Sequence, residues 1–397
     1  MTSKDLSKLL KERSSGGKKG NLFVLKKTAE KLGVLTPAYK TALIAGTNGK
    51  GTTAFLLAKT AEKNGLKAGL FTSPHIFDIR ERICVNGKKI STKDFCACLE
   101  KVLSAEVKPL KFFELLTLSA LVYFKQKKVD FAVFECGIGG LKDSTNIINA
   151  DISIITSVAK DHEQLLGSTI KEIAIQKAGI IKKEKPCILG QVSSEISKII
   201  KNICKQKKAV LFMPQAEDIK LDFKKKRTYF VYKNKKYSLN MLGQKQAQNA
   251  ALVILASEIL GFNKGLKKDF WGEFLQGRFE IKKINKNYLI KDGAHNPCAI
   301  KEFLNTYKKS PYFKKENILV YGVSKDKDYK TCIKLLKPYF KKVCLLEFNK
   351  SCKAKELKLF FKKCEFTEEK NLAKTKANIV QVGSFYLFEK LKQYLPL

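Results

Sequence analysis

All three histidines of this 397-residue chain lie in short motifs whose residue types could bind phosphate or a metal ion. His75 ends a Thr-Ser-Pro-His run, His162 follows Asp161, and His295 lies in Asp-Gly-Ala-His-Asn-Pro. Histidines scattered over a surface would not be expected to group in this way. A fourth motif, at residues 46–52, has the glycines, lysine and threonine of a phosphate loop. Together the four motifs indicate ATP-dependent chemistry.

The phosphate loop stands between an apolar run at 41–45 and a stretch of helical periodicity at 52–64. Glycines let backbone N–H groups converge on phosphate oxygens, and the helix N-terminus adds its positive dipole end. Lys50 is expected to reach the β- and γ-phosphates, and Thr52 to hold Mg²⁺. The spacing departs from the common pattern, because Gly51 stands where a hydroxyl residue is usual. The residues expected to bind ATP in this loop are Gly46, Thr47, Asn48, Gly49, Lys50, Gly51 and Thr52.

Strand-like and helix-like stretches alternate along the chain, which predicts parallel sheets joined by right-handed crossovers. Strands are predicted at 41–45, 67–72, 130–135, 152–157, 186–189, 288–292, 317–321, 342–348 and 378–382. Helices are predicted at 52–64, 112–127, 168–178, 244–260, 297–307, 329–340 and 385–394. A hairpin is expected around Asn234, and a domain boundary near Gly277 and Arg278. The predicted domains are therefore 1–276 and 277–397.

Length and composition favour a two-domain globular protein, since 44% of the residues are hydrophobic. No apolar run approaches the roughly 20 residues that span a bilayer, and the lysine-rich start does not resemble a signal peptide. The eleven cysteines are an odd number without a Cys-x-x-Cys pair, which argues against a disulfide framework or a zinc site. A cytoplasmic protein is expected.

The net charge of +40 has two interpretations. One is nucleic-acid binding, and the other is a general lysine bias at ordinary surface positions. The lysines occur in dispersed pairs and triplets without an aromatic-interleaved stripe, so the second interpretation is favoured and nucleic acid is not expected as a partner. A positive field would still attract nucleotides or polycarboxylates.

The motifs resemble those of the Mur ligase superfamily, and specifically its dihydrofolate synthase/folylpolyglutamate synthase branch. The resemblance begins at the phosphate loop and extends through segments in the same order as in that family. The matching segments are 70–75, 81–83, 86–87, 112–114, 135–140, 143–146, 161–162, 177–180, 277–280 and 292–297. It implies a central P-loop domain with a parallel sheet and a smaller Rossmann-like α/β C-terminal domain.

In that family, ATP phosphorylates a carboxylate, and the amine of L-glutamate then attacks the acyl phosphate. The resemblance implies metal ligation by Ser73, Glu135 and His162, in addition to Thr52. Glu135 at a strand end also suits Mg²⁺ on chemical grounds, because a hard cation prefers carboxylate oxygen. The resemblance further implies that Lys177 is carbamylated and catalytic together with His162 and Lys50.

The resemblance assigns further nucleotide contacts to Asn249, Arg278, Asp292 and His295. It assigns folate binding to Phe112, Phe113, Glu114, Lys142, Asp143 and Ser144. An interdomain salt bridge at Arg278, a helix cap after Asp292 and core packing of the phenylalanines are the structural alternatives. Leu141 stands where relatives carry arginine, and this departure leaves the substrate preference open.

The predicted function is an ATP-dependent ligase that adds L-glutamate to dihydropteroate, to (poly)glutamyl tetrahydrofolate, or to both, as a cytoplasmic monomer with no membrane partner. One alternative is a Mur-type ligase acting on a peptidoglycan precursor. The Thr-Ser-Pro-His stretch and the early phosphate loop argue against it. A second alternative is a non-catalytic basic protein that binds nucleotides or nucleic acid.

Overall fold

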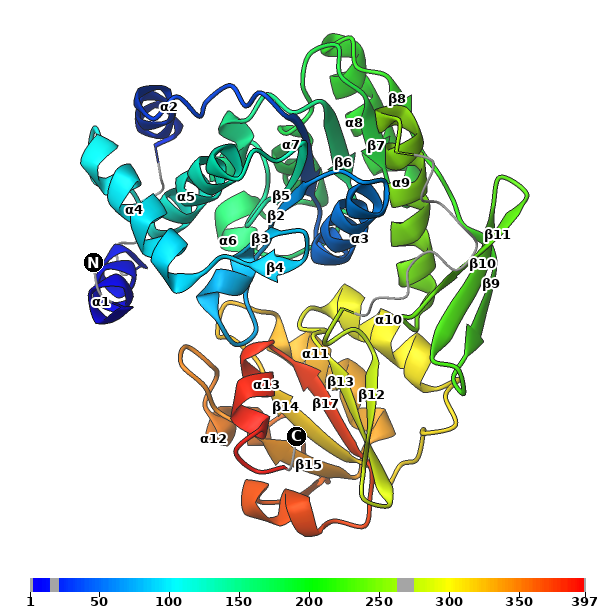
Figure 1. Cartoon of the computed structure of the whole chain (residues 1–397). Helices are drawn as coiled ribbons and strands as arrows, with labels where there is room; N and C mark the ends of the chain where they lie inside the picture. Colours follow the sequence, from blue (N-terminus) through cyan, green and yellow to red (C-terminus); the bar gives the residue numbers. More distant parts are fainter. Residues whose placement is uncertain (1–2, 15–20, 263–274, 396–397) are drawn as a thin grey trace. The chain divides into compact units, whose positions relative to one another are not determined.

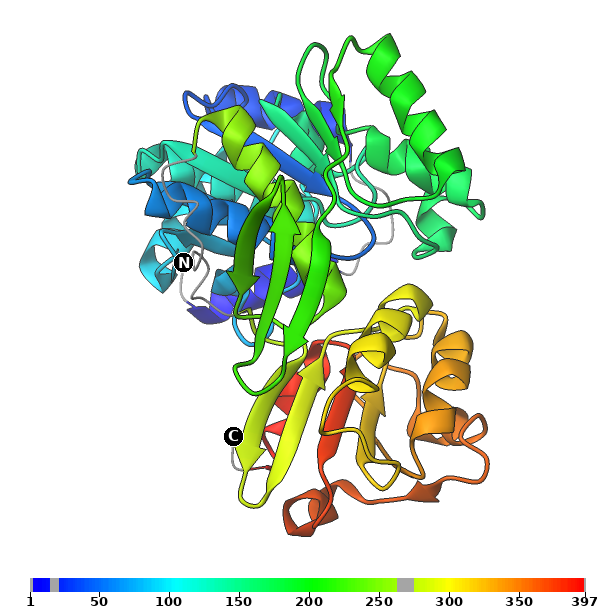
Figure 2. The same ribbon diagram turned by 90° about the vertical axis from the view of Figure 1, so that its right-hand side faces the viewer.

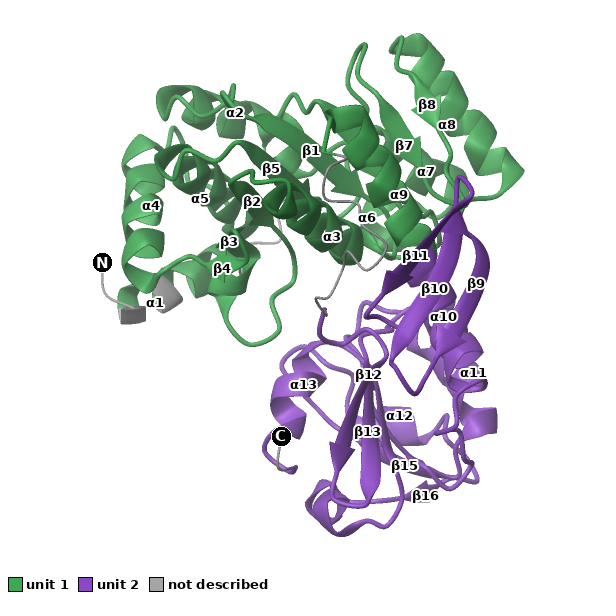
Figure 3. Ribbon diagram, turned by 45° about the vertical axis from the view of Figure 1, so that its right-hand side comes forward, with its two compact units in different colours: residues 1–215, 248–267 green, residues 216–247, 268–397 purple. Residues whose placement is uncertain are grey.

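The computed structural model describes residues 3–14, 21–262 and 275–395. They form two compact units, green and purple in Figure 3. The first unit comprises residues 1–215 and 248–267, and the second comprises 216–247 and 268–397. Helix α9 (Gln244–Leu260) therefore begins in the second unit and continues in the first. The predicted boundary near Gly277 stays a prediction.

An eight-stranded sheet forms the centre of the first unit, in the order β4-β3-β2-β5-β1-β6-β7-β8 (Figure 1). Strands β2, β5, β1, β6, β7 and β8 run parallel, whereas β3 and β4 are antiparallel at one edge. The strands are β1 (Lys40–Ala45), β2 (Ala68–Phe71), β3 (Ile83–Val85), β4 (Lys88–Lys89), β5 (Phe131–Glu135), β6 (Ile152–Ile155), β7 (Cys187–Leu189) and β8 (Leu211–Phe212).

The central strands of this sheet are almost continuously apolar, because helices cover them. Every residue of β5 is buried, and so is every residue of β1 after the first. Helix α3 packs against β1, β2 and β5. The helices are α1 (Ser3–Ser14), α2 (Leu22–Lys31), α3 (Lys50–Lys63), α4 (Thr92–Ala105), α5 (Phe112–Gln126), α6 (Glu163–Leu166), α7 (Ile170–Ala178) and α8 (Ser194–Gln206), with 3-10 turns η1 (Ile79–Arg82) and η2 (Ser144–Ile147).

The second unit contains a three-stranded antiparallel sheet, β11-β10-β9, and a six-stranded sheet, β12-β13-β17-β14-β15-β16 (Figure 2). The larger sheet is parallel except for β12. Its strands are β12 (Glu280–Ile284), β13 (Asn287–Asp292), β14 (Ile318–Gly322), β15 (Lys342–Leu345), β16 (Glu365–Phe366) and β17 (Ile379–Gly383). The smaller sheet has β9 (Glu217–Asp222), β10 (Arg227–Tyr232) and β11 (Lys235–Leu239), so the predicted hairpin is confirmed.

Alternate residues of the six-stranded sheet enter two separate apolar cores. Ile290 and Leu319 belong to one core, and Leu289 and Val320 belong to the other, because neighbouring side chains point to opposite faces. The helices of this unit are α10 (Pro297–Tyr307), α11 (Tyr329–Leu336), α12 (Ala354–Lys358) and α13 (Tyr386–Leu391), with 3-10 turns η3 (Lys337–Tyr339) and η4 (Glu369–Lys374). Within the described ranges, no helix combines the length and apolarity needed to cross a bilayer.

Candidate active site

The phosphate loop connects β1 to α3 and is held by the segment that follows β6. Thr47 N donates to Ser157 O over 2.9 Å, and Asn48 N donates to Ser157 Oγ over 3.0 Å. Thr156 Oγ1 donates to Asn48 O over 2.7 Å. The N–H groups of Thr47 and Asn48 are thus engaged within the protein. Phosphate binding would therefore use the first turn of α3, whose N–H groups lack helical partners.

Gly49 brings this loop into contact with a segment two hundred residues away. It is the N-cap residue immediately before α3, and its φ of 89° lies in the left-handed region. A Cβ at this position would lie 2.5 Å from Oδ1 of Asn249, a buried residue of α9. The fold therefore brings Asn249 and the phosphate loop together in the first unit. Lys50 follows, with Nζ 3.4 Å from Thr47 O.

Glu135 ends β5 beside the phosphate loop. It pairs in register with Ile44 of β1, two residues before Gly46, and only 3% of it is exposed. Ser73, just beyond the end of β2, donates its backbone N–H to Glu135 Oε2 over 2.9 Å. Two of the predicted metal ligands are therefore in direct contact, because parallel strands end at the same edge of the sheet. Thr52 is fully buried in the first turn of α3.

These oxygen donors fit a hard cation that arrives with the nucleotide. The described part of the chain contains no group of three or more His, Cys, Asp and Glu side chains that could enclose a metal. Mg²⁺ usually keeps several waters and binds one or two carboxylates plus substrate phosphates, so the Glu135 carboxylate with hydroxyl groups is sufficient. His162 is a softer donor. It precedes α6 in the left-handed region, with a φ of 53°.

Lys177 is buried, unlike most lysines near the end of a helix. It lies in the last turn of α7 with 3% of its surface exposed. Burial and the charge of Asp143 raise the pKa of the Cys136 thiol, and the positive charges of Lys50 and Lys177 oppose that rise. Both lysines therefore interact electrostatically with the residue that follows Glu135.

The loop after β5 is organised by one of the predicted folate contacts. Asp143 is buried and accepts hydrogen bonds from Ile138 N (3.0 Å), Thr145 N (3.0 Å) and Thr145 Oγ1 (2.7 Å). Burial raises the pKa of Asp143, and these hydrogen bonds oppose the rise. Ser144 is also buried, whereas Lys142 is exposed. Within this trio, Lys142 is thus the residue most open to solvent.

The predicted folate contacts on α5 have structural partners. Glu114 is buried and accepts from Lys111 N over 2.8 Å, which caps the helix. Burial raises the pKa of Glu114. The Phe113 ring centroid lies 5.5 Å from that of Phe71, and a Cβ on Gly137 would lie 2.9 Å from the Phe113 ring. Phe113 thus packs between the core and the loop that follows β5.

Arg82 lies beside Phe112 and contacts His75, one of the three motif histidines. Arg82 Nε donates to His75 Nδ1 over 2.9 Å, and its guanidinium carbon lies 5.4 Å from the Phe112 ring centroid. Burial and, to a smaller extent, the charge of Arg82 together lower the pKa of His75 to about 4. His75 is therefore neutral near pH 7. The Thr-Ser-Pro-His and Glu-Arg-Ile motifs indicated both residues, but not their contact.

In the second unit, Asp292 is the last residue of β13. Its side chain binds the backbone of an earlier segment and that of the segment that follows it. Its carboxylate accepts from Phe279 N and from Ala294 N, each over 2.9 Å. Burial raises the pKa of Asp292 to about 6, and the charge of Arg278 opposes this. The Arg278 guanidinium carbon lies 4.8 Å from the Phe385 ring centroid, a cation–π contact.

The residues after Asp292 form a helix cap. Asn296 Oδ1 accepts from Ala299 N over 2.9 Å, and Pro297 is the first residue of α10. His295 Nδ1 lies 2.7 Å from Gly293 O. If Nδ1 carries the proton of this bond, Nε2 is left as an acceptor. The cap structure and anion binding at this helix start are compatible.

The fold gathers the predicted site residues into two groups, one in each compact unit. The phosphate loop, metal, lysine and folate residues belong to the first unit together with Asn249, and the second unit holds Arg278, Asp292 and His295. Sequence reasoning omitted Thr156 and Ser157, which brace the loop. Their place at the end of a predicted strand is the signal that could have indicated them.

Known proteins resemble this chain over most of its length. Residues 44–257 match the Mur ligase middle domain, and residues 277–384 match the Mur ligase, glutamate ligase domain. The dihydrofolate synthase/folylpolyglutamate synthase of Bacillus subtilis (strain 168) is 33% identical over 349 residues, which cover 81% of this chain and 79% of that protein. The enzyme of the same name from Escherichia coli (strain K12) is 33% identical, with coverages of 76% and 71%.

Solved structures share the fold. Escherichia coli FolC in complex with DHPP and ADP has a TM-score of 0.84 and 30% identity, with coverages of 98% of this chain and 97% of that chain. A bifunctional folylpolyglutamate synthase/dihydrofolate synthase with Mn, AMPPNP and L-glutamate bound has a TM-score of 0.82 and 26% identity, with 98% of each chain covered.

Proposed function

The chain belongs to the dihydrofolate synthase/folylpolyglutamate synthase family of Mur ligases, and from this premise we propose its substrates and the roles of its residues. It is an ATP-dependent ligase that adds L-glutamate to dihydropteroate, to (poly)glutamyl tetrahydrofolate, or to both. The observation that carries this proposal is the register of β1 and β5, which puts Glu135 beside the phosphate loop. A buried carboxylate next to a phosphate site suits a nucleotide bound with a divalent cation.

The reaction has two steps. A carboxylate oxygen of the acceptor attacks the γ-phosphorus of ATP, ADP leaves, and an acyl phosphate forms. The amine of L-glutamate then attacks the acyl carbon, loses a proton and expels phosphate. Lys50 and the first turn of α3 would neutralise the negative charge of the transferred phosphoryl group. Asn249, which touches the loop, would contact the nucleotide.

Mg²⁺ would be held by Glu135, Ser73 and Thr52, with His162 at the same site. When bound, it would offset the charge of the phosphates. Lys177 is buried in the last turn of α7, and its charge acts on the Cys136 thiol, which follows Glu135 in the chain. Conversion to a carbamate would give Lys177 the oxygen donors that a hard cation prefers.

The remaining proposed roles are nucleotide binding and folate binding. Arg278, Asp292 and His295 are proposed as further nucleotide contacts, and the guanidinium of Arg278 suits phosphate oxygens. Phe112, Phe113 and Lys142 would meet the folate substrate. We further propose that the protein is a monomer and that it lies in the cytoplasm, and the eleven free cysteines support the second of these proposals.

The test is ATP-dependent phosphate release in the presence of L-glutamate, with dihydropteroate and tetrahydrofolate as parallel acceptors and mass spectrometry of the products. Release with one or both acceptors, each gaining one glutamate mass, identifies the substrate class. Lys50→Ala should abolish release, whereas Lys63→Gln at the far end of α3 should not. Silence with both acceptors, although ATP binds, would contradict the proposal.

A further inference from the structure

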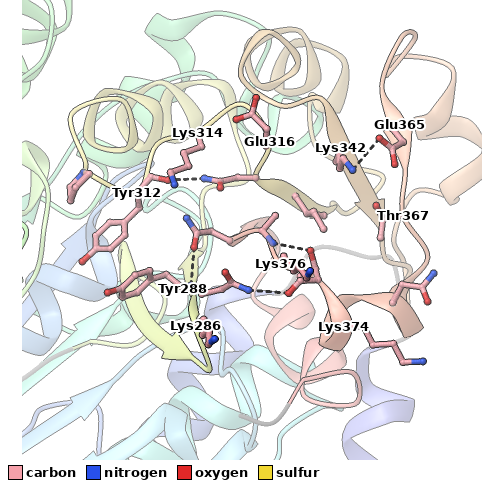
Figure 4. Close-up of a pocket in the computed structure, with 18 of the residues that line it drawn as sticks. Lys286, Tyr288, Tyr312, Lys314, Glu316, Lys342, Glu365, Thr367, Lys374 and Lys376 are labelled. Atoms are coloured by element: carbon pink, nitrogen blue, oxygen red, sulfur yellow. Dashed lines mark hydrogen bonds and ion pairs between the residues drawn. The ribbon is translucent and has the colours of Figure 1, made fainter.

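A pocket of about 1200 Å³ lies in the second unit, at the amino ends of β13, β14, β15 and β17 (Figure 4). Its lining includes Asn287, Ile318, Lys342 and Asn378, which begin or precede those strands. Asp292 lies at the carboxyl end of β13, roughly 17 Å away at 3.3 Å per residue. The pocket is therefore on the opposite edge of the sheet from the predicted nucleotide contacts.

The pocket carries an excess of positive charge, because most of its lysines have no acidic partner among the described residues. Its ionisable lining is Lys224, Lys286, Lys314, Lys342, Lys374, Lys376, Glu316 and Glu365, together with two tyrosines. Lys342 pairs with Glu365 over 3.3 Å, and Glu316 pairs with Lys341 over 3.7 Å. Among the residues that the structure describes, the other five lysines of the pocket have no acidic partner. Because like charges repel, a bound anion is the group that would relieve this concentration of charge.

An aromatic wall accompanies the lysines. The ring centroids of Tyr288 and Tyr312 lie 4.6 Å apart with a 58° tilt, and both residues are half-buried. Figure 4 shows the two rings on one side of the pocket and Lys342 with Glu365 on the other. Pro311 adds further apolar surface to the lining. A simple anion would make no use of such a wall, whereas a planar ring would pack on it.

Hydrogen bonds within and between loops order the walls of the pocket. Asn287 Nδ2 donates to Thr375 O over 2.9 Å, and Asn317 Nδ2 donates to Tyr312 O over 2.7 Å. Ala377 N donates to Thr375 Oγ1 over 3.1 Å. The loop before β17 is therefore tied to β13, and the loop before β14 is tied together within itself. A preformed wall loses less conformational freedom on binding.

We propose that this pocket binds an aromatic polyanion, meaning a planar ring joined to a short chain of phosphates or carboxylates. The ring would pack on Tyr288 and Tyr312, and the chain would lie among the lysines, which act as point charges toward either anion. Two sources have this chemistry. One is a nucleoside polyphosphate, and the other, which rests on the proposed function, is a pterin with a γ-linked glutamate tail.

Hydrogen–deuterium exchange of the full chain locates such binding without relying on turnover. The ligands are ADP and pteroyltri-γ-glutamate, together with the ringless diphosphate and tri-γ-glutamate. Peptides over 311–317 and 374–378 report on the pocket, and peptides over 46–53 report on the phosphate loop. We expect at least one ring-bearing ligand to protect the pocket peptides at a concentration at least tenfold below its ringless counterpart. Which of the two does so identifies the source.

Two variants and a control test the assignment to these residues. A triple variant with Lys286→Gln, Lys314→Gln and Lys376→Gln should raise the half-protecting concentration at least tenfold. Tyr312→Leu should remove the advantage of the ring while the response to the ringless anions persists. A control with Lys301→Gln, Lys334→Gln and Lys362→Gln loses the same charge at exposed positions outside the pocket.

Two results would overturn the proposal. One is unchanged exchange of the pocket peptides with all four ligands while ADP protects the phosphate loop. The other is an equal loss of protection in the control, which would assign the effect to overall charge. Neither result bears on glutamate ligation, which the phosphate-release assay measures separately.

Discussion

Gly49→Ala is the substitution whose cost follows most directly from the geometry of the phosphate loop. A left-handed backbone costs an alanine about 1–2 kcal/mol. The new methyl group would lie 2.5 Å from Asn249 Oδ1, and overpacking of this kind costs about 1–3 kcal/mol. A stiffer unfolded chain offsets about 0.4–1 kcal/mol of this. The net loss is about 3 kcal/mol, which lowers the Tm of a unit this size by roughly 6–12 °C.

Calorimetry on four variants, namely Gly49→Ala, Gly65→Ala, Asn249→Ala and the double variant at 49 and 249, separates the two contributions. Gly65→Ala is the matched control, because Gly65 has a similar φ of 81° but nothing lies within 4 Å of its added Cβ. It should lose about 1 kcal/mol from backbone strain alone. Adding Asn249→Ala to Gly49→Ala should recover about 1–2 kcal/mol, measured as coupling in a double-mutant cycle. Equal losses at Gly49 and Gly65, or no recovery, would refute the contact between Asn249 and the phosphate loop.

Three further predictions concern the buried ionisable groups. Lys177→Ala should abolish turnover while ATP still binds, and turnover at the wild-type rate would exclude the carbamate role. Glu135→Gln can still accept the Ser73 N–H bond, so it should fold, but the divalent-cation concentration for half-maximal turnover should rise about 10- to 100-fold in a metal titration. The folded pKa of Asp292, about 6, lies above the ordinary 3.8, so the folded protein holds a proton that the unfolded chain releases. The free energy of unfolding should therefore fall by about 3 kcal/mol as pH rises from about 4 to 6, and urea titrations of Asp292→Asn should lack that slope.

Elements with clean local patterns were predicted accurately from the sequence. Helices α9 and α10 begin and end where their composition and the Asn296–Pro297 cap indicate. Helices α4 and α8 were missed although their buried residues recur at helical spacing. In α8 these residues are Ile196, Ile200 and Cys204, and the lysines between them do not interrupt that pattern. The antiparallel strand β12 was missed as well, since the alternating pattern predicts only parallel pairing.

Some features of the candidate site are encoded in consecutive residues, and others depend on contacts between distant segments. The phosphate loop and the cap after Asp292 are encoded in consecutive residues, so their motifs were sufficient. The contact of Gly49 with Asn249, and that of Arg82 with Phe112, join segments that no local pattern relates. Resemblance to the family indicated Asn249, but only the packing of α9 shows why it lies at the loop.

The first unit is built from two stretches of the chain that are synthesised at different times. Residues 1–215 leave the ribosome first, yet the first unit also needs residues 248–267. At about 5–20 residues per second, those residues follow several seconds later. Until Asn249 emerges, the nascent phosphate loop lacks a neighbour that shapes it. The phosphate loop of a partly made chain therefore lacks its contact with Asn249 until the small β-sheet of the second unit has been translated.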